Sequence, residues 1–302
     1  TTASNNTAVG YSALTANTTG TRNTAVGMSA GAAITTGSYN VLMGAYTGDA
    51  ITTGEQNVAV GDAALSANIT GTDNVSIGDQ SLKVNTASNN TAVGSSALYA
   101  NTTGAQNTAV GKSALTANTT GATNTAVGEG ALLINTTGSY HVALGRLAGQ
   151  NITTGDGNVC LGYNALASSA TVNNEFTLGS TSITSLRCND TTISSLSDSR
   201  DKTDVIDSPY GLGFINTVRP VQFKWESRDG NGKDGWTRVG FIAQELLVAC
   251  DGNNAVLDLV SEENPEKLEA KYGNLLPIAI QAIQELSAQV DALTARITTL
   301  EG

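Results

Sequence analysis

One six-residue segment of the chain combines a nucleophile with several charged groups: Ser197-Asp198-Ser199-Arg200-Asp201-Lys202. A serine hydroxyl is a weak nucleophile and needs a neighbouring base to take its proton. The only histidine, His141, is distant in the sequence. A Ser–His–Asp triad is therefore disfavoured, and a lysine is the remaining base of suitable strength. A lysine amine acts as a base near neutral pH only when partial desolvation favours its neutral form.

The same residues also have a purely structural interpretation. Ser197 and Asp198 are typical of a helix or turn cap, and Lys202 would then be a solvated charge. The segment alone favours this interpretation. Its position favours chemistry, because the composition changes abruptly at Ser197: both tryptophans and all four prolines follow it.

The residues that follow predict a small domain able to position such a site. Residues 220–225 alternate as a strand with Val221, Phe223 and Trp225 on one face. Residues 230–235 are rich in glycine and predict a turn, and residues 236–242 predict the partner strand. Residues 243–249 predict a short helix packed beneath this hairpin.

The chain ends in a heptad pattern that predicts a coiled-coil helix. The two seam positions are Leu276, Ile283, Val290 and Ile297, and Ala279, Leu286, Leu293 and Leu300. β-Branched residues at one position and leucine at the other favour two strands in an isolated coil. The repeat described below favours three chains instead. Its larger interface should dominate a helix of only four heptads.

Three motifs in this order resemble the S74 family of self-cleaving peptidases, the intramolecular chaperones of tailspikes and endosialidases. They are S-D-x-R-x-K, R-P-V-x-F-x-W and G-F-I-A-Q-E, followed by a terminal helix, within residues 197–302. The resemblance implies a catalytic dyad of Ser197 and Lys202 and cleavage of the Leu196–Ser197 bond. Family members usually carry an apolar residue before the lysine. Asp201 stands there in this chain, and its carboxylate would favour the charged lysine and slow cleavage.

Residues before this region repeat with a period of 17. The pattern N-T-A-V-G and its variants end at Gly10, Gly27, Gly44, Gly61, Gly78, Gly94, Gly111, Gly128, Gly145, Gly162 and Gly179. Every interval is 17 residues except the 16 between Gly78 and Gly94. One unit cannot bury its own apolar residues, whereas a stack of units can. The repeat therefore predicts a β-solenoid of eleven coils, roughly 50 Å long at a strand spacing of about 4.8 Å.

Each unit is expected to supply two short strands separated by turns. The residue before each glycine is always apolar, as at Val110, and is expected in the core. An asparagine recurs four residues before the glycine, and stacked amides can bond from coil to coil. These asparagines are Asn6, Asn23, Asn40, Asn57, Asn74, Asn90, Asn107 and Asn124. His141 takes the same position and is expected to form or cap one rung. Cys160 replaces an alanine and is expected to be a small buried thiol.

The repeat is similar to the head repeats of trimeric autotransporter adhesins and of phage fibres that share them. The resemblance implies a homotrimer of left-handed parallel β-rolls over residues 1–183. The expected fold is therefore mainly β, with a connector over residues 184–196 and an α+β chaperone domain with a coiled-coil helix over residues 197–302.

Composition excludes several function classes. A net charge of −11 disfavours nucleic-acid binding, because the chain would repel phosphates. Three widely spaced cysteines form no zinc or disulfide pattern, so no cofactor or metal is expected. No apolar run is long enough to predict a membrane span. The sequence begins inside a repeat without a methionine, which indicates a truncated or processed fragment.

The sequence therefore predicts a phage tail fibre that assembles as a homotrimer and then cuts itself once. Its expected location is the virion, and its expected partners are its own copies and a host receptor, either a glycan or a surface protein. A bacterial surface adhesin with the same repeat and chaperone is the alternative, with an extracellular location. A glycan hydrolase needs paired carboxylates in a groove, and the acidic residues of the repeat are scattered among different positions.

Overall fold

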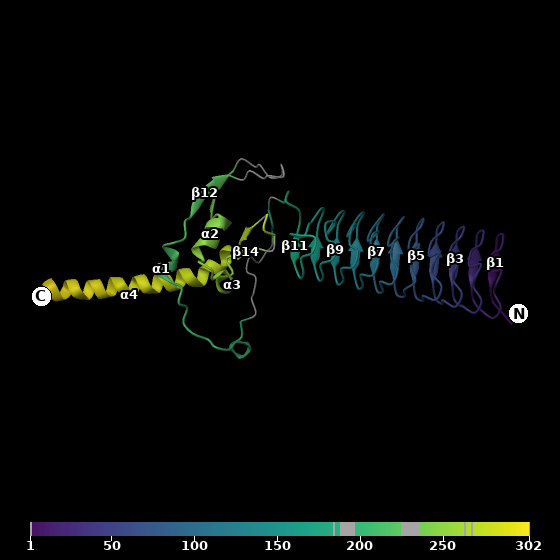
Figure 1. The fold of residues 1–302 in the computed structure, drawn as a ribbon, viewed down its shortest axis with the longest axis horizontal. Helices are drawn as coiled ribbons and strands as arrows, with labels where there is room; N and C mark the ends of the chain where they lie inside the picture. The colour runs from purple at the N-terminus through teal and green to yellow at the C-terminus, as the bar shows by residue number, and fades with distance from the viewer. Residues whose placement is uncertain are drawn as a thin grey trace. The chain divides into compact units, whose positions relative to one another are not determined.

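The repeat forms a parallel β-solenoid in the computed structural model, with one three-residue strand in each coil (Figure 1). The structure describes residues 2–183, 185–187, 197–224, 236–262, 264–266 and 268–301. The chain divides into two units, Thr1–Ile183 and Thr184–Gly302. The predicted order of a mainly β solenoid, a small α+β region and a C-terminal helix is confirmed. Most of the predicted connector lies outside the described residues.

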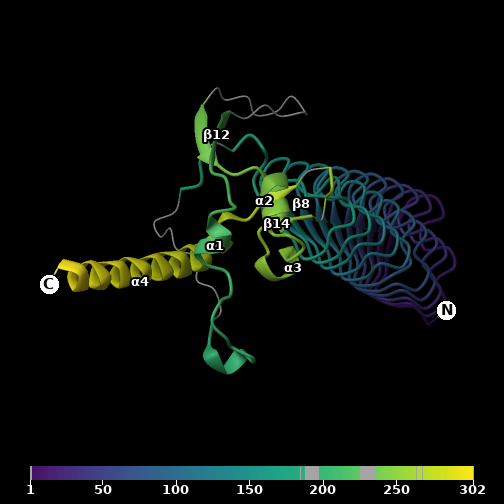
Figure 2. The ribbon, with the colours of Figure 1, turned by 60° about the vertical axis from the view of Figure 1, so that its left-hand side comes forward.

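Eleven strands stack in chain order into one sheet, and the successive coils overlap in the view of Figure 2 because they have similar shapes. The strands are β1 (Thr7–Val9), β2 (Thr24–Val26), β3 (Val41–Met43), β4 (Val58–Val60), β5 (Val75–Ile77), β6 (Thr91–Val93), β7 (Thr108–Val110), β8 (Thr125–Val127), β9 (Val142–Leu144), β10 (Val159–Leu161) and β11 (Phe176–Leu178). Neighbouring strands are 17 residues apart, except β5 and β6, where Val75 pairs with Thr91. The turn of this coil is one residue shorter, and there the Ala87 carbonyl accepts from Asn74 Nδ2 at 2.9 Å. In most other coils a glycine carbonyl accepts the equivalent hydrogen bond from the asparagine.

The strands orient their side chains differently from the prediction. The central strand residue is buried from β2 to β10, and in most of these strands it is alanine. The apolar residue before the glycine points outward: Val110 is 36 % exposed, whereas Ala109 is fully buried. The prediction that this residue lies in the core is therefore wrong. Successive strand residues face opposite sides, and the interior beside Ala109 is already filled by leucines such as Leu115.

The second predicted strand of each coil does not form. The residues after the glycine adopt turns, and in the coils from Gly10 to Gly145 the fourth of them has a left-handed backbone, as at Leu115 with φ 51°. Leu115 is nonetheless fully buried, and its N–H donates to the Ala131 carbonyl of the next coil at 3.0 Å. Three coils carry glycine at this position, and this residue type indicates a left-handed backbone there from the sequence alone. They are Gly31, Gly48 and Gly149.

Where glycine replaces that leucine, an isoleucine replaces an asparagine three positions later. The pairs are Gly31 with Ile34, Gly48 with Ile51, and Gly149 with Ile152. A Cβ on Gly48 would lie 2.8 Å from Ile51 Cδ1, so the isoleucine occupies space that the leucine fills in other coils. The exchange keeps the core close-packed, which protein interiors require.

The glycine that ends each strand is required by its neighbour in the stack. Gly111 has φ 133°, a backbone conformation that only glycine adopts readily. A Cβ there would lie 2.6 Å from the carbonyl carbon and oxygen of Gly128 in the next coil. The close approach of successive backbones therefore explains why this position is glycine in the coils from Gly10 to Gly145.

Asparagine amides form two columns in the solenoid, and the second extends only from Asn85 to Asn135. The predicted column is confirmed: Asn57 Nδ2 donates to Asn40 Oδ1 at 3.0 Å, and the Asn57 N–H donates to the same oxygen at 3.1 Å. A second column was not predicted; there Asn118 Nδ2 donates to Asn101 Oδ1 at 2.8 Å. The first column ends at Glu175, whose carboxylate accepts from the Ser168 N–H at 2.9 Å. These bonds satisfy polar groups whose burial would otherwise destabilise the fold.

His141 forms a rung of the first column, as predicted. Its N–H donates to Asn124 Oδ1 at 2.9 Å, and its Nδ1 accepts from the Asn158 N–H at 3.0 Å. Its Nε2 is buried with no hydrogen-bond partner among the described residues. Burial lowers the pKa of His141, and the Gly155 carbonyl and the Asp156 charge oppose that shift only in part. The fold therefore favours the neutral imidazole, because a protonated Nδ1 could not accept from Asn158.

We expect the wild-type solenoid to lose stability in acid relative to His141→Asn. With its pKa lowered in the folded state, His141 binds a proton mainly in the unfolded chain, so stability falls as the pH drops below about 6.5. The pH-dependent loss should approach about 1.4 kcal/mol per pH unit. Urea unfolding midpoints of both chains at pH 7.5 and 5.5 measure this difference. Midpoints that shift equally in the two chains would contradict the assignment.

The second unit contains short helices, two small antiparallel strand pairs and one long helix (Figure 1). Its elements are η1 (Ser199–Asp201), α1 (Leu212–Ile215), β12 (Val221–Lys224), β13 (Thr237–Gly240), α2 (Ala243–Ala249), α3 (Asn254–Leu257), β14 (Val260–Ser261), β15 (Glu269–Ala270), η2 (Tyr272–Asn274) and α4 (Leu275–Glu301). The predicted hairpin is confirmed by the pairing of β12 with β13, and the predicted short helix is α2. Trp225 and the predicted turn over residues 230–235 lie outside the described residues.

Helix α4 packs only by its first turns. Leu275, Ile278 and Ala282 are buried, and Glu285 accepts from the Leu212 N–H at the start of α1 at 2.8 Å. The leucine, isoleucine and valine residues of the heptad seam are exposed. Its exposed members are Leu276, Ile283, Leu286, Val290, Leu293, Ile297 and Leu300. Among the described residues, no helix combines the length and apolar character that crossing a membrane requires.

Candidate active site

Residues 197–202 form a tight turn that folds the lysine back onto the serine. The turn contains η1, and the Lys202 N–H donates to the Ser199 carbonyl at 3.3 Å. Lys202 Nζ then lies 2.6 Å from Ser197 Oγ and donates to it. The structure therefore brings the two predicted site residues into direct contact.

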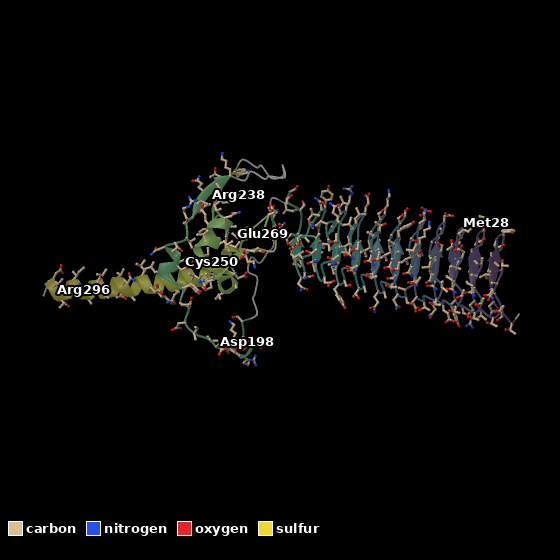
Figure 3. All side chains as sticks on the ribbon, viewed as in Figure 1. Met28, Asp198, Arg238, Cys250, Glu269 and Arg296 are labelled. Atoms are coloured by element: carbon tan, nitrogen blue, oxygen red, sulfur yellow. The ribbon has the colours of Figure 1, made fainter. Side chains whose placement is uncertain are left out.

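Asp198 caps this turn, and Figure 3 labels it on its loop. Its Oδ1 accepts from the Arg200 N–H at 2.9 Å, and its Oδ2 lies 2.6 Å from Arg200 Nη2. Hydrogen bonds from the Arg200 side chain, and then from its backbone, lower the pKa of Asp198. The predicted turn cap is therefore present at Asp198, and the same turn places Lys202 beside Ser197. Arg200 had no predicted role, although its position two residues after the capping aspartate was a signal.

The whole turn is exposed to solvent in the single chain. In this contact Lys202 Nζ is the donor and the Ser197 hydroxyl oxygen is the acceptor. Proton abstraction needs the reverse, with the hydroxyl donating to a neutral amine. Loss of hydration around the lysine favours that neutral form. Leu196 lies outside the described residues, so the structure gives the bond before Ser197 no geometry.

An ion pair joins the second and third motifs of this unit. Arg219, from R-P-V-x-F-x-W, donates through Nε to Glu245 Oε2 at 2.9 Å, and its Nη2 also contacts Glu245 Oε1. Glu245 belongs to G-F-I-A-Q-E, and the hydrogen bonds from Arg219 lower its pKa. The two motifs are thus held together between the start of β12 and α2.

The glycine of the third motif makes room for a tyrosine. Tyr272 Oη accepts from the Phe241 N–H at 3.3 Å, and the two rings meet edge to face at 5.3 Å. A Cβ on Gly240 would lie 2.8 Å from Tyr272 Oη. This contact was not predictable from sequence spacing, because Tyr272 lies about thirty residues further along the chain.

The described residues contain neither a reactive cysteine nor a cluster of metal ligands. Cys160 is buried as predicted, and burial raises the pKa of its thiol to about 11. Burial also raises the pKa of Cys250, so neither thiol favours the reactive thiolate. Across the described ranges, no group of three or more histidine, cysteine, aspartate and glutamate side chains could hold a metal ion.

Comparison with known proteins identifies the region that contains the turn. Residues 197–256 match the Peptidase_S74 family, described as the chaperone of endosialidase. The match begins at Ser197 and ends before η2 and α4, so it is shorter than the expected 197–302. No curated protein and no solved structure matched the chain. The match indicates an S74-type chaperone segment at residues 197–256, and in that family such segments generally serve trimer assembly and autocleavage.

Proposed function

We propose that this protein is the subunit of a homotrimeric tail fibre that cleaves itself once, between Leu196 and Ser197. Its solenoid forms the shaft or display surface, and the chaperone domain over residues 197–302 drives trimer assembly. The observation that carries the proposal is the 2.6 Å contact between Lys202 Nζ and Ser197 Oγ, at the first residue of the S74 match.

The proposed chemistry is an acyl shift followed by hydrolysis. Neutral Lys202 takes the proton of the Ser197 hydroxyl, and Ser197 Oγ attacks the carbonyl carbon of Leu196. The bond from that carbon to the Ser197 nitrogen breaks, and the lysine proton passes to the nitrogen, which becomes the new amino terminus. Water then hydrolyses the Leu196–Ser197 ester and restores the hydroxyl. The reaction is single-turnover because the chain is its own substrate.

The timing of cleavage follows from the environment of the turn. Lys202 is exposed and hydrated in the single chain, whereas a lysine acts as a base where its surroundings exclude water. Packing against further copies removes that hydration and turns the contact into a base–nucleophile pair. Cleavage is therefore expected after assembly. It then removes the domain that set the arrangement and leaves a kinetically stable shaft.

The exposed seam of α4 supports assembly through the chaperone domain. Seven apolar side chains at heptad spacing face solvent in the single chain. Large exposed apolar surfaces of this kind mark interaction sites, and a coiled coil between copies would cover them.

The biological setting is inferred from the combination of repeat and chaperone. A long rod that is trimerised and then released fits the tail fibre of a phage virion, with a host surface glycan or protein as its receptor. An extracellular bacterial adhesin is the second candidate, because the same repeat suits a surface display rod.

Intact mass and a denaturing gel of the purified full-length chain test the proposal. A fragment ending at Leu196 and a second one beginning at Ser197 are the expected products. Their appearance should follow trimer formation in a time course of refolding. A chain that stays intact as a stable trimer would contradict self-cleavage.

A further inference from the structure

Arg200 forms a charged pair in the turn that the proposed chemistry does not use. Its Nε donates to Asp198 Oδ1 at 3.0 Å, and its Nη2 donates to Asp198 Oδ2 at 2.6 Å. The guanidinium therefore holds both carboxylate oxygens, in the bidentate arrangement that gives arginine–carboxylate pairs a fixed geometry. The Arg200 N–H also donates to Asp198 Oδ1 at 2.9 Å, so this residue binds the carboxylate through its backbone and its side chain together.

The position of Lys202 depends on the turn that Asp198 caps. Side chains five residues apart do not face each other in a regular helix, where neighbours are three or four residues apart. The backbone completes one short turn instead, in which the Asp201 N–H donates to the Asp198 carbonyl at 3.1 Å. Lys202 then leaves the turn in an extended conformation, with φ −124° and ψ 138°. A helix of three residues has little stability of its own, so its cap contributes much of what holds it together.

The Asp198 carboxylate also affects the charge of the proposed base. A negative charge close to an amine favours its protonated form, which cannot take the serine proton. Three aspartates lie close to Lys202 in the sequence, at Asp198, Asp201 and Asp204. Arg200 is the only other basic residue between the first and the last of them. An unpaired carboxylate at position 198 would therefore compete with the serine hydroxyl for the lysine amine.

The pairing with Arg200 removes one of these three charges from the vicinity of the lysine. Hydrogen bonds from the Arg200 side chain, and then from its backbone, lower the pKa of Asp198, so this carboxylate stays ionised wherever a lysine could lose its proton. Arginine stays protonated over the same range. The pair therefore has no net charge while Lys202 titrates. A paired carboxylate is also less costly to bury than a lone one, which matters when packing against further copies removes water.

We propose that Arg200 is a positioning residue for self-cleavage. It fixes the capped turn that brings Lys202 to Ser197. It also keeps the Asp198 carboxylate from pairing with the lysine. The proposal rests on the Ser–Lys cleavage of the proposed function and adds a residue outside that pair. The two effects are separable, because the turn affects the rate at every pH, whereas the charge affects the pH at which cleavage begins.

The test compares the pH dependence of cleavage in the wild-type chain and in Arg200→Gln. Each full-length chain is first assembled at about pH 6, where the charged amine makes cleavage slow, and its solution mass is measured. Intact mass against time then gives the cleavage rate after transfer to higher pH. The unpaired Asp198 of the variant should move the midpoint of the rate–pH profile upward by about one unit. Cleavage below that midpoint should then be about tenfold slower, because the fraction of neutral amine is tenfold smaller.

A second substitution in the same chain separates charge from structure. Asparagine accepts a hydrogen bond at an N-cap as well as aspartate does, but it carries no charge. The double variant Asp198→Asn/Arg200→Gln should therefore return the midpoint to the wild-type value. Asp198→Ala removes the cap while Arg200 remains. It should cleave roughly fivefold more slowly at every pH, the usual effect of losing one N-cap, without an upward movement of the midpoint.

Arg146→Gln is the matched control. Arg146 forms an exposed ion pair with Glu129 in the solenoid, with 3.2 Å between Nε and Oε2. The substitution changes composition and net charge as Arg200→Gln does, and it also removes an arginine–carboxylate pair. It should leave the cleavage rate and the midpoint unchanged. A midpoint that moves equally in both variants would reveal a general effect of net charge and overturn the proposal.

The remaining outcomes keep the two proposals distinguishable. A wild-type chain that is cut, with Arg200→Gln cut at the same rate and midpoint, overturns the role of Arg200 and leaves self-cleavage intact. A double variant whose midpoint stays raised also overturns that role, because the Asp198 charge would not be the cause. A wild-type chain that is never cut overturns both proposals.

Solution mass before the transfer shows whether Arg200→Gln assembles. If it does not, Asp198→Asn tests the same charge with Arg200 in place. Its midpoint should lie at or below the wild-type value, because the lysine then has one carboxylate fewer nearby. A raised midpoint in this variant overturns the proposal.

Discussion

Ser197→Ala is expected to leave the chain at full length, because it removes the hydroxyl that Lys202 Nζ contacts. Lys202→Ala should slow cleavage on the order of 10²–10⁴-fold, the usual contribution of a general base. If the two residues act as a unit, the double variant should be no slower than the slower single one. Intact mass against time after refolding measures each rate. The wild-type rate should rise with pH, since only the neutral amine takes a proton.

Two matched variants separate chemistry from structure in the same turn. Ser199→Ala removes a hydroxyl two residues from the proposed nucleophile and should cleave normally. Lys202→Arg keeps the charge and a donor to Ser197, but a guanidinium cannot act as a base, so cleavage should be lost. Full-rate cleavage by Ser197→Ala would refute the assignment. Full-rate cleavage by Lys202→Arg would transfer the role of base to another residue.

A chain synthesised only to Leu196 is expected to be insoluble or monomeric. The fragment of identical sequence, released from the full chain by cleavage, is expected to be a soluble trimer. The two samples have the same sequence and differ only in whether the chain folded with residues 197–302 attached. Eleven similar coils offer many mispaired arrangements, and assemblies built from long-range pairings are slow to fold and prone to misassociation. The chaperone domain should therefore decide the outcome kinetically, before it is removed.

Supplying residues 197–302 as a separate chain is the control for this experiment. It should not rescue the truncated chain, because register can be imposed only through a covalent connection. Solution mass and the solubility of both samples measure the effect. Normal trimers from the truncated gene would show that the solenoid assembles without a template.

The sequence by itself determined the architecture of the shaft. A glycine at 17-residue intervals implies one close backbone approach per coil, and the structure shows that approach between Gly111 and Gly128. The recurrent asparagines implied a ladder, and His141 was recognisable as one of its rungs because it occupies their position. Periodic residues are predictable in this way, since each coil repeats the same local environment.

The family resemblance, more than the residues alone, pointed to Ser197 and Lys202. Asp198 and Arg200 were visible as charges, but their mutual pairing was not. Two residues five apart can lie close or far, depending on the backbone between them. The capped turn decides this by bringing the lysine back onto the serine.

Only the tertiary structure decided which side of each strand is the core. In the strand sequence T-A-V, either the alanine or its two neighbours could face the core, and the larger valine was expected there. The left-handed backbone at Leu115 turns that leucine into the coil, where it fills the interior beside Ala109. Once that space is occupied, only the small alanine fits inward, and Val110 must face outward. The orientation thus depends on packing between segments of the coil, which no periodicity within one segment can reveal.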